Sequence, residues 1–223
     1  MIKTIKLINF QDMVECNDSL HQSKESFLAV NYEFKKGNVY GLISDFGCGS
    51  WGLSNCVGGR GTSEHTGKIL LNNDEISVNK LSEYSCFITE KIFQDVNSES
   101  NLMTPKECIA KALSISKQPY TIEQIKKWFC LSDGRFERPI EYIGTEIWTI
   151  SIAVNFALGK EIYCYPWLNM IDISRFMIAY EEKIIDLLKS TGKIVIVPSS
   201  QKRVLRKYCD HTIFFEKGKM IYR

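Results

Sequence analysis

The chain has 223 residues, 44% of them hydrophobic and 24% charged, a balance typical of a globular protein with one large domain. Its formal net charge of +2 gives no support for a nucleic-acid partner. Eight cysteines and three histidines are scattered without close pairs, which argues against a zinc site and a disulfide framework. No metal is therefore expected, and the thiols fit a reducing compartment.

Neither targeting nor membrane insertion is indicated. The N-terminal segment MIKTIKLINF is too short and too charged for the apolar part of a signal peptide. No apolar run approaches the roughly 20 residues that a membrane helix needs. We expect a cytoplasmic protein, unless a membrane protein recruits it to the inner face of the membrane.

The N-terminal half is predicted to consist mainly of strands, because apolar residues alternate with polar ones or form short runs. The expected strands are residues 2–10, 27–34, 39–44 and 84–90, with a hairpin over residues 67–76 that turns at Asn72-Asn73. The polar segment 11–25 is interpreted as a loop. Residues 50–57 predict a short helix that ends at Gly58-Gly59.

Helix signals begin at Thr104. A proline follows this residue, and Glu107 stands three positions after it, which is a strong helix start. Thr121 and Gln124 repeat the spacing. Residues 104–140 are therefore predicted to form a helical subdomain inserted into an α/β chain.

The C-terminal half alternates between helices and buried strands. Helices are expected over residues 146–158, 173–192 and 201–209, strands over residues 160–168 and 193–200, and a closing hairpin over residues 211–223. Buried strands that alternate with helices predict a mostly parallel sheet. The expected fold class is therefore α/β.

A glycine-rich stretch after the strand at 39–44 can be interpreted in two ways. Its residues of interest are Ser44, Gly47, Gly49, Ser50, Trp51 and Gly52. Gly47, Gly49 and Gly52 match G-x-G-x-x-G, with Asp74 as the acid that would bind a ribose. However, three residues separate Ile43 from Gly47, which suits the longer phosphate-binding loop G-x-x-x-x-G-K-[ST]. On that template, Ser50 stands for the lysine and Trp51 for the hydroxyl residue.

Over nearly its whole length the chain resembles the nucleotide-binding domain of ABC transporters. The segments that carry the resemblance are FKKGNVYGLIS, GKILLNNDEI, YSCFITE, YIGTEIWTISIAVNFALGKEI, NMID and CDHTIFFEKGKMIY, in this order. The resemblance implies a single domain over residues 1–223 with a P-loop NTPase-like ABC ATPase fold. It also implies a mostly parallel core sheet, an N-terminal antiparallel β subdomain and the helical insertion.

The residues expected to do the family's chemistry are missing. Walker A needs a lysine for the phosphates and a hydroxyl for Mg²⁺, whereas this chain has Ser50 and Trp51. Trp51 could also occupy the space of the phosphates. Walker B needs Asp and Glu after an apolar strand, and its position falls on Tyr165-Pro166 or Pro166-Trp167. Neither register supplies a carboxylate.

The remaining family positions are equally altered. The signature, which contacts the γ-phosphate on the partner subunit, carries Ile143, Gly144 and Thr145. Only its glycine matches the family. The switch histidine is replaced around Ser199, and the Q-loop position carries Glu90.

Four further residues match family positions less closely. Asp172 matches the D-loop aspartate, for which a structural role is expected, and His211 is interpreted as a surface residue. Phe10 and Phe27 are the nearest candidates for the aromatic residue that stacks on adenine in the family.

We therefore expect a pseudo-ATPase with no catalytic residues and no bound ATP or Mg²⁺. Its partners would be a transmembrane permease, docked at residues 90–105, and a second ABC domain in a homodimer or heterodimer. One alternative is a subunit that binds nucleotide weakly and still gates or powers transport, through stacking on Trp51 or Mg²⁺ at Glu90. Another is a soluble adaptor or immunity protein without a permease.

Overall fold

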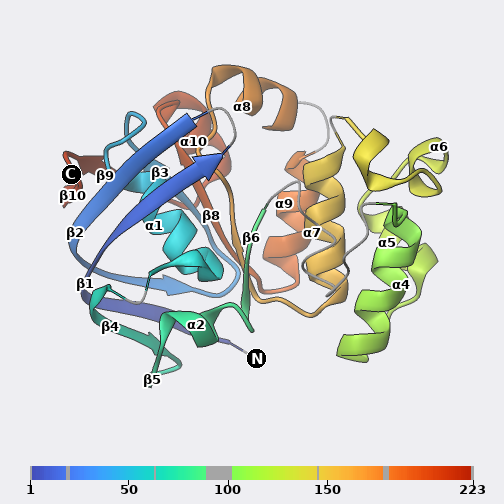
Figure 1. Cartoon of the computed structure of the whole chain (residues 1–223), viewed down its shortest axis with the longest axis horizontal. Coiled ribbons are helices and arrows are strands. Elements are labelled where there is room, and N and C mark those ends of the chain that lie inside the picture. Colours follow the sequence, from blue (N-terminus) through green and yellow to red (C-terminus); the bar gives the residue numbers. More distant parts are fainter. Residues whose placement is uncertain are drawn as a thin grey trace. The chain divides into compact units, whose positions relative to one another are not determined.

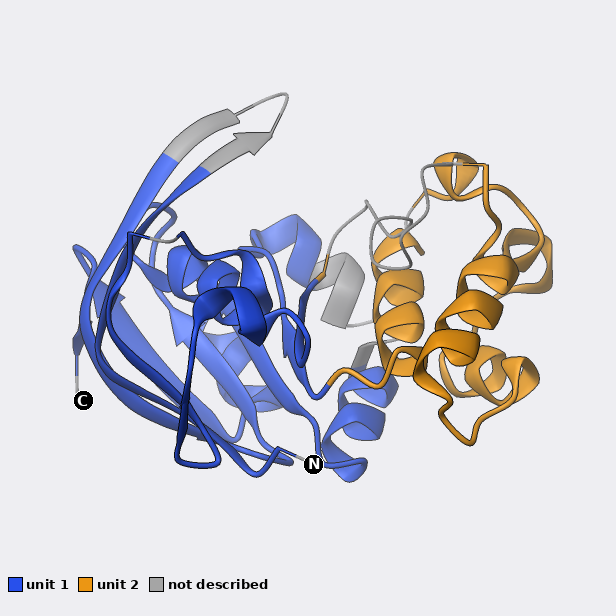
Figure 2. Cartoon of the chain, turned by 60° about the horizontal axis from the view of Figure 1, so that its bottom comes forward, with its two compact units in different colours: residues 1–87, 161–223 blue, residues 88–160 orange. Residues whose placement is uncertain are grey.

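The computed structural model describes residues 2–18, 21–62, 64–88, 102–144, 146–177 and 181–221. The chain divides into two compact units (Figure 2). Unit 1 comprises residues 1–87 and 161–223, and unit 2 comprises residues 88–160. The predicted helical insertion, residues 104–140, lies inside unit 2.

The described residues of unit 1 form a ten-stranded sheet with the order β5-β4-β1-β2-β10-β9-β3-β8-β7-β6 (Figure 1). The strands are β1 (Thr4–Asp18), β2 (His21–Lys35), β3 (Val39–Ile43), β4 (Thr66–Leu71), β5 (Asp74–Ile76), β6 (Ser85–Phe87), β7 (Ile162–Cys164), β8 (Ile194–Ser199), β9 (His211–Glu216) and β10 (Lys219–Ile221).

The sheet has an antiparallel part and a mostly parallel part. β1 pairs antiparallel with β2 and with β4, and β4 pairs antiparallel with β5. β6, β7, β8, β3 and β9 form parallel pairs, whereas β9 and β10 are antiparallel. Leu28 of β2 and Lys219 of β10 join the two parts in a parallel pairing. The predicted α/β class with an N-terminal antiparallel region is confirmed.

The helices accompany the sheet in unit 1 and dominate unit 2. Unit 1 contains α1 (Ser50–Asn55), the π-helical turn η1 (Cys56–Arg60), α2 (Val78–Leu81), α8 (Met170–Met177), α9 (Glu181–Ser190) and α10 (Lys202–Tyr208). Unit 2 contains α4 (Pro105–Ser116), α5 (Ile122–Trp128), α6 (Asp133–Phe136), the 3-10 turn η2 (Ile140–Tyr142) and α7 (Ile147–Ala157). None of the helices that the structure describes is both long and apolar enough to span a membrane.

The predicted helix starts of unit 2 are confirmed. Thr104 caps α4, since its hydroxyl accepts a hydrogen bond from the Glu107 amide and the Glu107 carboxylate accepts one from the Thr104 amide. Thr121 and Gln124 form the same reciprocal cap at α5. Each of these reciprocal caps, known as capping boxes, satisfies backbone N–H groups that a helix start otherwise leaves unpaired.

The prediction of a loop over residues 11–25 is wrong. In the structure β1 extends to Asp18 and β2 begins at His21, and the two form one long curved ribbon (Figure 1). The segment is polar because some of its inward-facing residues are themselves polar. Asp12 is buried, and its carboxylate accepts hydrogen bonds from the Thr62 amide (2.9 Å) and the Thr62 hydroxyl (2.6 Å). The simple apolar alternation that predicts a strand is therefore broken.

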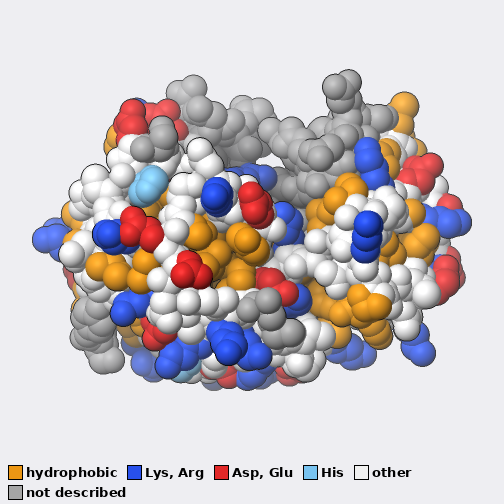
Figure 3. Space-filling view, turned by 90° about the horizontal axis from the view of Figure 1, so that it is seen from below, with side chains coloured by type: hydrophobic (Ala, Val, Ile, Leu, Met, Phe, Trp, Pro, Cys, Tyr) orange, Lys and Arg blue, Asp and Glu red, His pale blue; other side chains and the backbone are white. Residues whose placement is uncertain are grey.

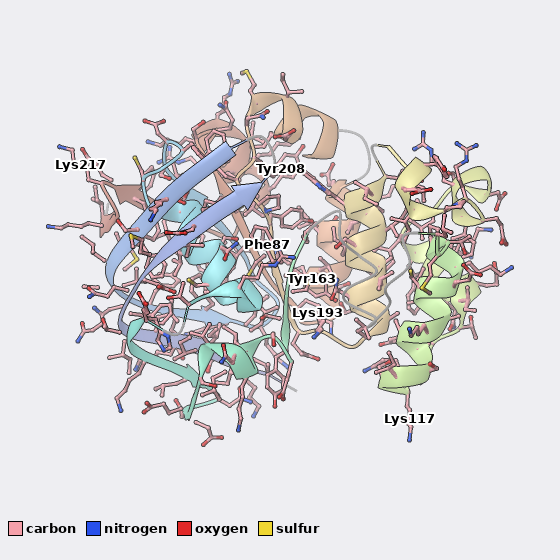
Figure 4. The ribbon with its side chains drawn as sticks, in the orientation of Figure 1. Phe87, Lys117, Tyr163, Lys193, Tyr208 and Lys217 are labelled. Atoms are coloured by element: carbon pink, nitrogen blue, oxygen red, sulfur yellow. The ribbon has the colours of Figure 1, made fainter. Side chains whose placement is uncertain are left out.

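The core of unit 1 lies against the strands and is rich in aromatic side chains. Tyr163 of β7 is fully buried, and Lys193, just before β8, pairs with Glu161 at 3.1 Å (Figure 4). The guanidinium of Arg60 lies 4.9 Å from the centre of the Phe87 ring. On the face drawn in Figure 3, Lys and Arg side chains are interspersed with Asp and Glu, which agrees with the small net charge.

Candidate phosphate-binding loop

The glycine-rich stretch lies between β3 and α1, the place of a phosphate-binding loop in a P-loop fold. Gly47 has φ +82° and Gly49 has φ +108°, values that other residues adopt only with strain. Positive φ angles beside helical ones turn successive amides toward one point and form an anion-binding nest. The loop therefore keeps the backbone shape that binds an anion, although residues 44–54 include no lysine or arginine.

The anion in this nest is the chain's own Glu25. The amide of Gly49 donates to Oε1 of Glu25 at 2.5 Å, and the amide of Gly52 donates to Oε2 at 2.6 Å. The backbones of Gly47 and Trp51 also act to lower the pKa of this carboxyl. Glu25 belongs to β2, in which it pairs with Val14 of β1. The long ribbon thus carries a carboxylate into the loop.

Burial dominates the electrostatics of Glu25. Only 2% of its surface is exposed, and this burial raises the pKa of its carboxyl above 4.5, whereas the bonds from the loop amides act in the opposite direction. Among the described residues, none of the ion pairs includes Glu25. The loop backbone is therefore the main partner of this carboxylate.

Side chains at the lysine and first-glycine positions pair with each other. The hydroxyls of Ser44 and Ser50 lie 2.5 Å apart, and both residues are buried. The Ser44 hydroxyl also contacts the Asp45 carbonyl at 2.8 Å. The ring of Trp51 belongs to the hydrophobic core, with 6% exposed. Carboxylate oxygens of Glu25, rather than the Trp51 ring, thus occupy the nest.

The strand pair β9–β10 closes the loop from a second side. The amide of Gly218 donates to the Cys48 carbonyl at 3.0 Å, and the amide of Leu28 donates to the Gly218 carbonyl at 2.8 Å. A Cβ atom added to Gly49 would lie 3.0 Å from Gly218 Cα and 3.3 Å from the carbonyl oxygen of Ser26. Backbone of β2 and of the β9–β10 turn therefore packs directly on the loop.

The predicted Walker B position, residues 165–167, carries aromatic side chains. Tyr165 is fully buried, and Trp167 stacks edge-on against Phe46 of the loop, with ring centres 5.4 Å apart. The Trp167 indole donates to the Ser44 carbonyl at 3.3 Å. Pro166 lies between these two aromatic residues in the sequence. The structure brings Trp167 to the loop as a packing residue, with no group that could hold Mg²⁺.

The switch and D-loop positions are engaged in local hydrogen bonds. Ser199 is buried, and its hydroxyl donates to the Leu168 carbonyl at 2.5 Å. Asp172 and Asn169 cap the start of α8 together: the Asp172 amide donates to Asn169 Oδ1 at 2.9 Å, and the Asn169 amide approaches Asp172 Oδ2 at 3.4 Å. His211 is exposed and stacks on Tyr40 with ring centres 5.1 Å apart.

The two candidates for an adenine-stacking ring are both inside the core. Phe10 and Phe27 are fully buried, and their rings lie 5.5 Å apart, so neither offers a free face to a base. Asp74, proposed as a ribose-binding acid on the dinucleotide template, is exposed at the start of β5, directly after the Asn72-Asn73 turn.

Unit 2 holds the signature position, which is described by itself. Ile143 is buried, and a Cβ atom at Gly144 would meet nothing within 4 Å. The Gly144 carbonyl accepts a hydrogen bond from the Ile147 amide at 3.2 Å, at the start of α7. Thr145 and Glu90 lie outside the described residues, as does most of the segment proposed to dock a permease, residues 90–105.

The loop as a whole has the backbone geometry of an anion nest, and residues 44–54 include no lysine or arginine. In the part of the chain that the structure describes, no group of three or more His, Cys, Asp or Glu residues is placed to hold a metal ion. Sequence reasoning missed Glu25, because segment 11–25 was interpreted as a loop. A usable signal was present: Glu25 and Phe27 are two positions apart, so a strand would place both on one face.

Comparison with known proteins supports the fold of the chain, but it does not establish a function. No protein-family model matches the sequence, and no curated protein matches it. The structure is similar to a bacterial ABC transporter cassette solved as a dimer, with a TM-score of 0.70 and 16% identity over 98% of this chain and 97% of that one. It is also similar to CbiO1 from Clostridium perfringens, part of the ABC transporter complex CbiONQ (TM-score 0.68, 16% identity, covering 100% and 88%). A nucleotide-free ATP-binding cassette from an ABC transporter gives a TM-score of 0.70 at 14% identity, covering 99% and 90%.

Proposed function

We propose that this chain is an ABC-type cassette subunit that has kept the fold and lost ATP chemistry. Its role is structural or regulatory, on the cytoplasmic side of a membrane permease. The fold supports the first part, since the structure matches the ABC ATPase fold along nearly the whole chain. The partners are inferred from the neighbours alone, which include a dimeric cassette and a subunit of a transporter complex.

One observation carries the proposed loss of ATP chemistry: the Glu25 carboxylate is bonded to the loop amides that would face a phosphate. A triphosphate entering the loop would meet this carboxylate instead of a lysine, and like charges repel at short range. Phosphoryl transfer depends on positioned positive charge and a metal ion. A carboxylate in the nest, with serine at the lysine position, opposes both binding and turnover.

The resemblance to ABC domains extends the proposal to dimers. In that family each ATP lies between the Walker A loop of one chain and the signature of the other. This chain carries Ser50 in the first motif and Ile143 in the second. A homodimer or a heterodimer with a competent cassette would therefore contain no complete ATP site. Closure of such a heterodimer driven by ATP would contradict the proposal.

The test combines binding and turnover. A fluorescent ATP analogue with Mg²⁺ is titrated against the purified chain up to millimolar concentration, and phosphate release is measured in parallel. We expect no saturable binding, and phosphate release no higher than from heat-denatured protein. Turnover that is abolished by Ser50→Ala would overturn the proposal, because that change removes a loop hydroxyl without introducing a new charge.

The association with a permease needs a separate measurement. The chain is expressed with an affinity tag in its native host, and membranes are separated from the soluble fraction. We expect the chain in the membrane fraction, released by detergent together with a protein of several membrane spans. Recovery of all of the protein from the soluble fraction would instead favour the interpretation as an adaptor or immunity protein.

A further inference from the structure

Glu25 is the most unusual buried group in the described part of the chain. A carboxylate that is 2% exposed normally needs a cation or strong hydrogen bonds, because burial removes its hydration. Here the bonds come from the backbone of one loop, at 2.5 and 2.6 Å from the amides of Gly49 and Gly52. These are the lengths of charge-assisted hydrogen bonds.

The relation between the loop and the carboxylate is that of a binding site and its ligand. Gly47 and Gly49 adopt positive φ angles that aim amides at one point, and each oxygen of Glu25 accepts from a different amide. The carboxylate belongs to β2, and Glu25 precedes Gly49 by 24 residues in the sequence. Since the loop contacts Glu25 through backbone amides, another oxyanion of similar size would fit the same amides.

We propose that Glu25 is the resident ligand of the loop, and that removal of its carboxylate turns the loop into a binding site for small oxyanions such as formate, acetate or inorganic phosphate. The inference deepens the proposed function at the same loop. It also makes Glu25 the link between the loop and the β1–β2 ribbon. In this chain the carboxylate of Glu25, which is part of the protein itself, holds the loop in its liganded shape in place of a nucleotide.

The experiment is chemical rescue of thermal stability at pH 8. Glu25→Ala is compared with the wild type and with Glu33→Ala, a matched control that removes an exposed glutamate from the same strand. Melting temperatures are measured in sodium chloride and, at equal ionic strength, in sodium formate, acetate or phosphate. Glu25→Ala is expected to melt at least about 5 °C below the other two, because buried amides lose their acceptor.

Rescue is the decisive readout. The oxyanions are expected to raise the melting temperature of Glu25→Ala by about 3–6 °C when their concentration reaches about ten times Kd. They should shift the wild type and Glu33→Ala no more than chloride does. Equal shifts in all three proteins, or equal melting temperatures of Glu25→Ala and Glu33→Ala, would overturn the proposal. Glu25→Gln should not be rescued, since its amide still fills the space.

A second measurement covers the case in which Glu25→Ala does not fold in chloride. Amide proton resonances of Gly49 and Gly52 are expected far downfield in the wild type, because their bonds to a carboxylate are short. Glu25→Gln should move both resonances upfield, and Glu33→Gln should move neither. Unchanged resonances in Glu25→Gln would overturn the proposal without any melting experiment. Neither measurement uses nucleotide. A negative result would therefore overturn the proposal about Glu25 without deciding whether the chain hydrolyses ATP.

Discussion

Replacement of Gly49 by alanine tests whether the loop is closed by the protein itself. A methyl group at this position would lie 3.0 Å from Gly218 Cα, 3.2 Å from the Phe215 ring and 3.3 Å from the Ser26 carbonyl oxygen. Two of these neighbours are backbone atoms, which cannot rotate away. A loop left open for a nucleotide would not present this backbone to the methyl group.

The magnitude follows from three terms. A left-handed φ costs a residue with a Cβ about 1–2 kcal/mol, and the stiffer unfolded chain returns about 0.4–1 kcal/mol. Overpacking against fixed neighbours adds about 1–3 kcal/mol. Gly49→Ala should therefore lower the unfolding free energy by about 2–4 kcal/mol, which corresponds to about 4–16 °C in melting temperature for a chain of this size.

Gly47→Ala provides the matched control. Gly47 also has a positive φ, of +82°, but a Cβ atom there would meet nothing within 4 Å. The strain term remains and the packing term disappears, so the expected loss is about 1 kcal/mol, or about 2–4 °C. Thermal and urea unfolding of both variants measure the difference. Equal losses for Gly47→Ala and Gly49→Ala would refute the closed arrangement of the loop.

Four other changes have expected outcomes. Burial raises the pKa of Glu25 above 4.5, so the stability of the wild type relative to Glu25→Gln should be greatest below pH 4.5 and fall as the pH rises through the raised pKa; urea unfolding between pH 4 and 8 measures it, and a difference that grows with pH would contradict it. Trp167→Phe keeps an aromatic ring but loses the bond to Ser44, and should cost about 1 kcal/mol in urea, whereas Trp167→Ala should cost at least twice as much. Asp12→Ala leaves several donors unpaired and should cost about 2–4 kcal/mol, with a loss below 1 kcal/mol counting against the network. Thr104→Ala removes a helix cap and should cost about 1 kcal/mol, seen as reduced hydrogen-exchange protection in α4.

Much of the fold could be predicted from the sequence, because its signals are local. The Thr104 box sets the start of α4, and the Asn72-Asn73 turn, with φ of +51° and +77°, sets the hairpin between β4 and β5. Continuous apolar runs predict the central strands β3 and β8, whose residues are all buried. In each case neighbouring residues decide the conformation.

The site was harder to predict, because its key contact is not local. The spacing around Gly49 predicts a phosphate-binding loop, and the loop has that backbone geometry. The occupant comes from segment 11–25, whose polar pattern predicts an exposed loop. Asp12 and Glu25 are polar and buried, since their partners are backbone amides and hydroxyls contributed by other segments. A pattern based on hydrophobicity alone cannot predict such partners.

The pairing of Leu28 with Lys219 has a consequence for the order of folding. These residues join the antiparallel and parallel parts of the sheet, and they come from opposite ends of the chain. Contacts between distant segments form late, because a long loop must close first. Glu25 and Gly49 are much nearer in sequence and bond directly. On a ribosome, therefore, the carboxylate can reach the loop amides before β9 and β10 have been synthesised.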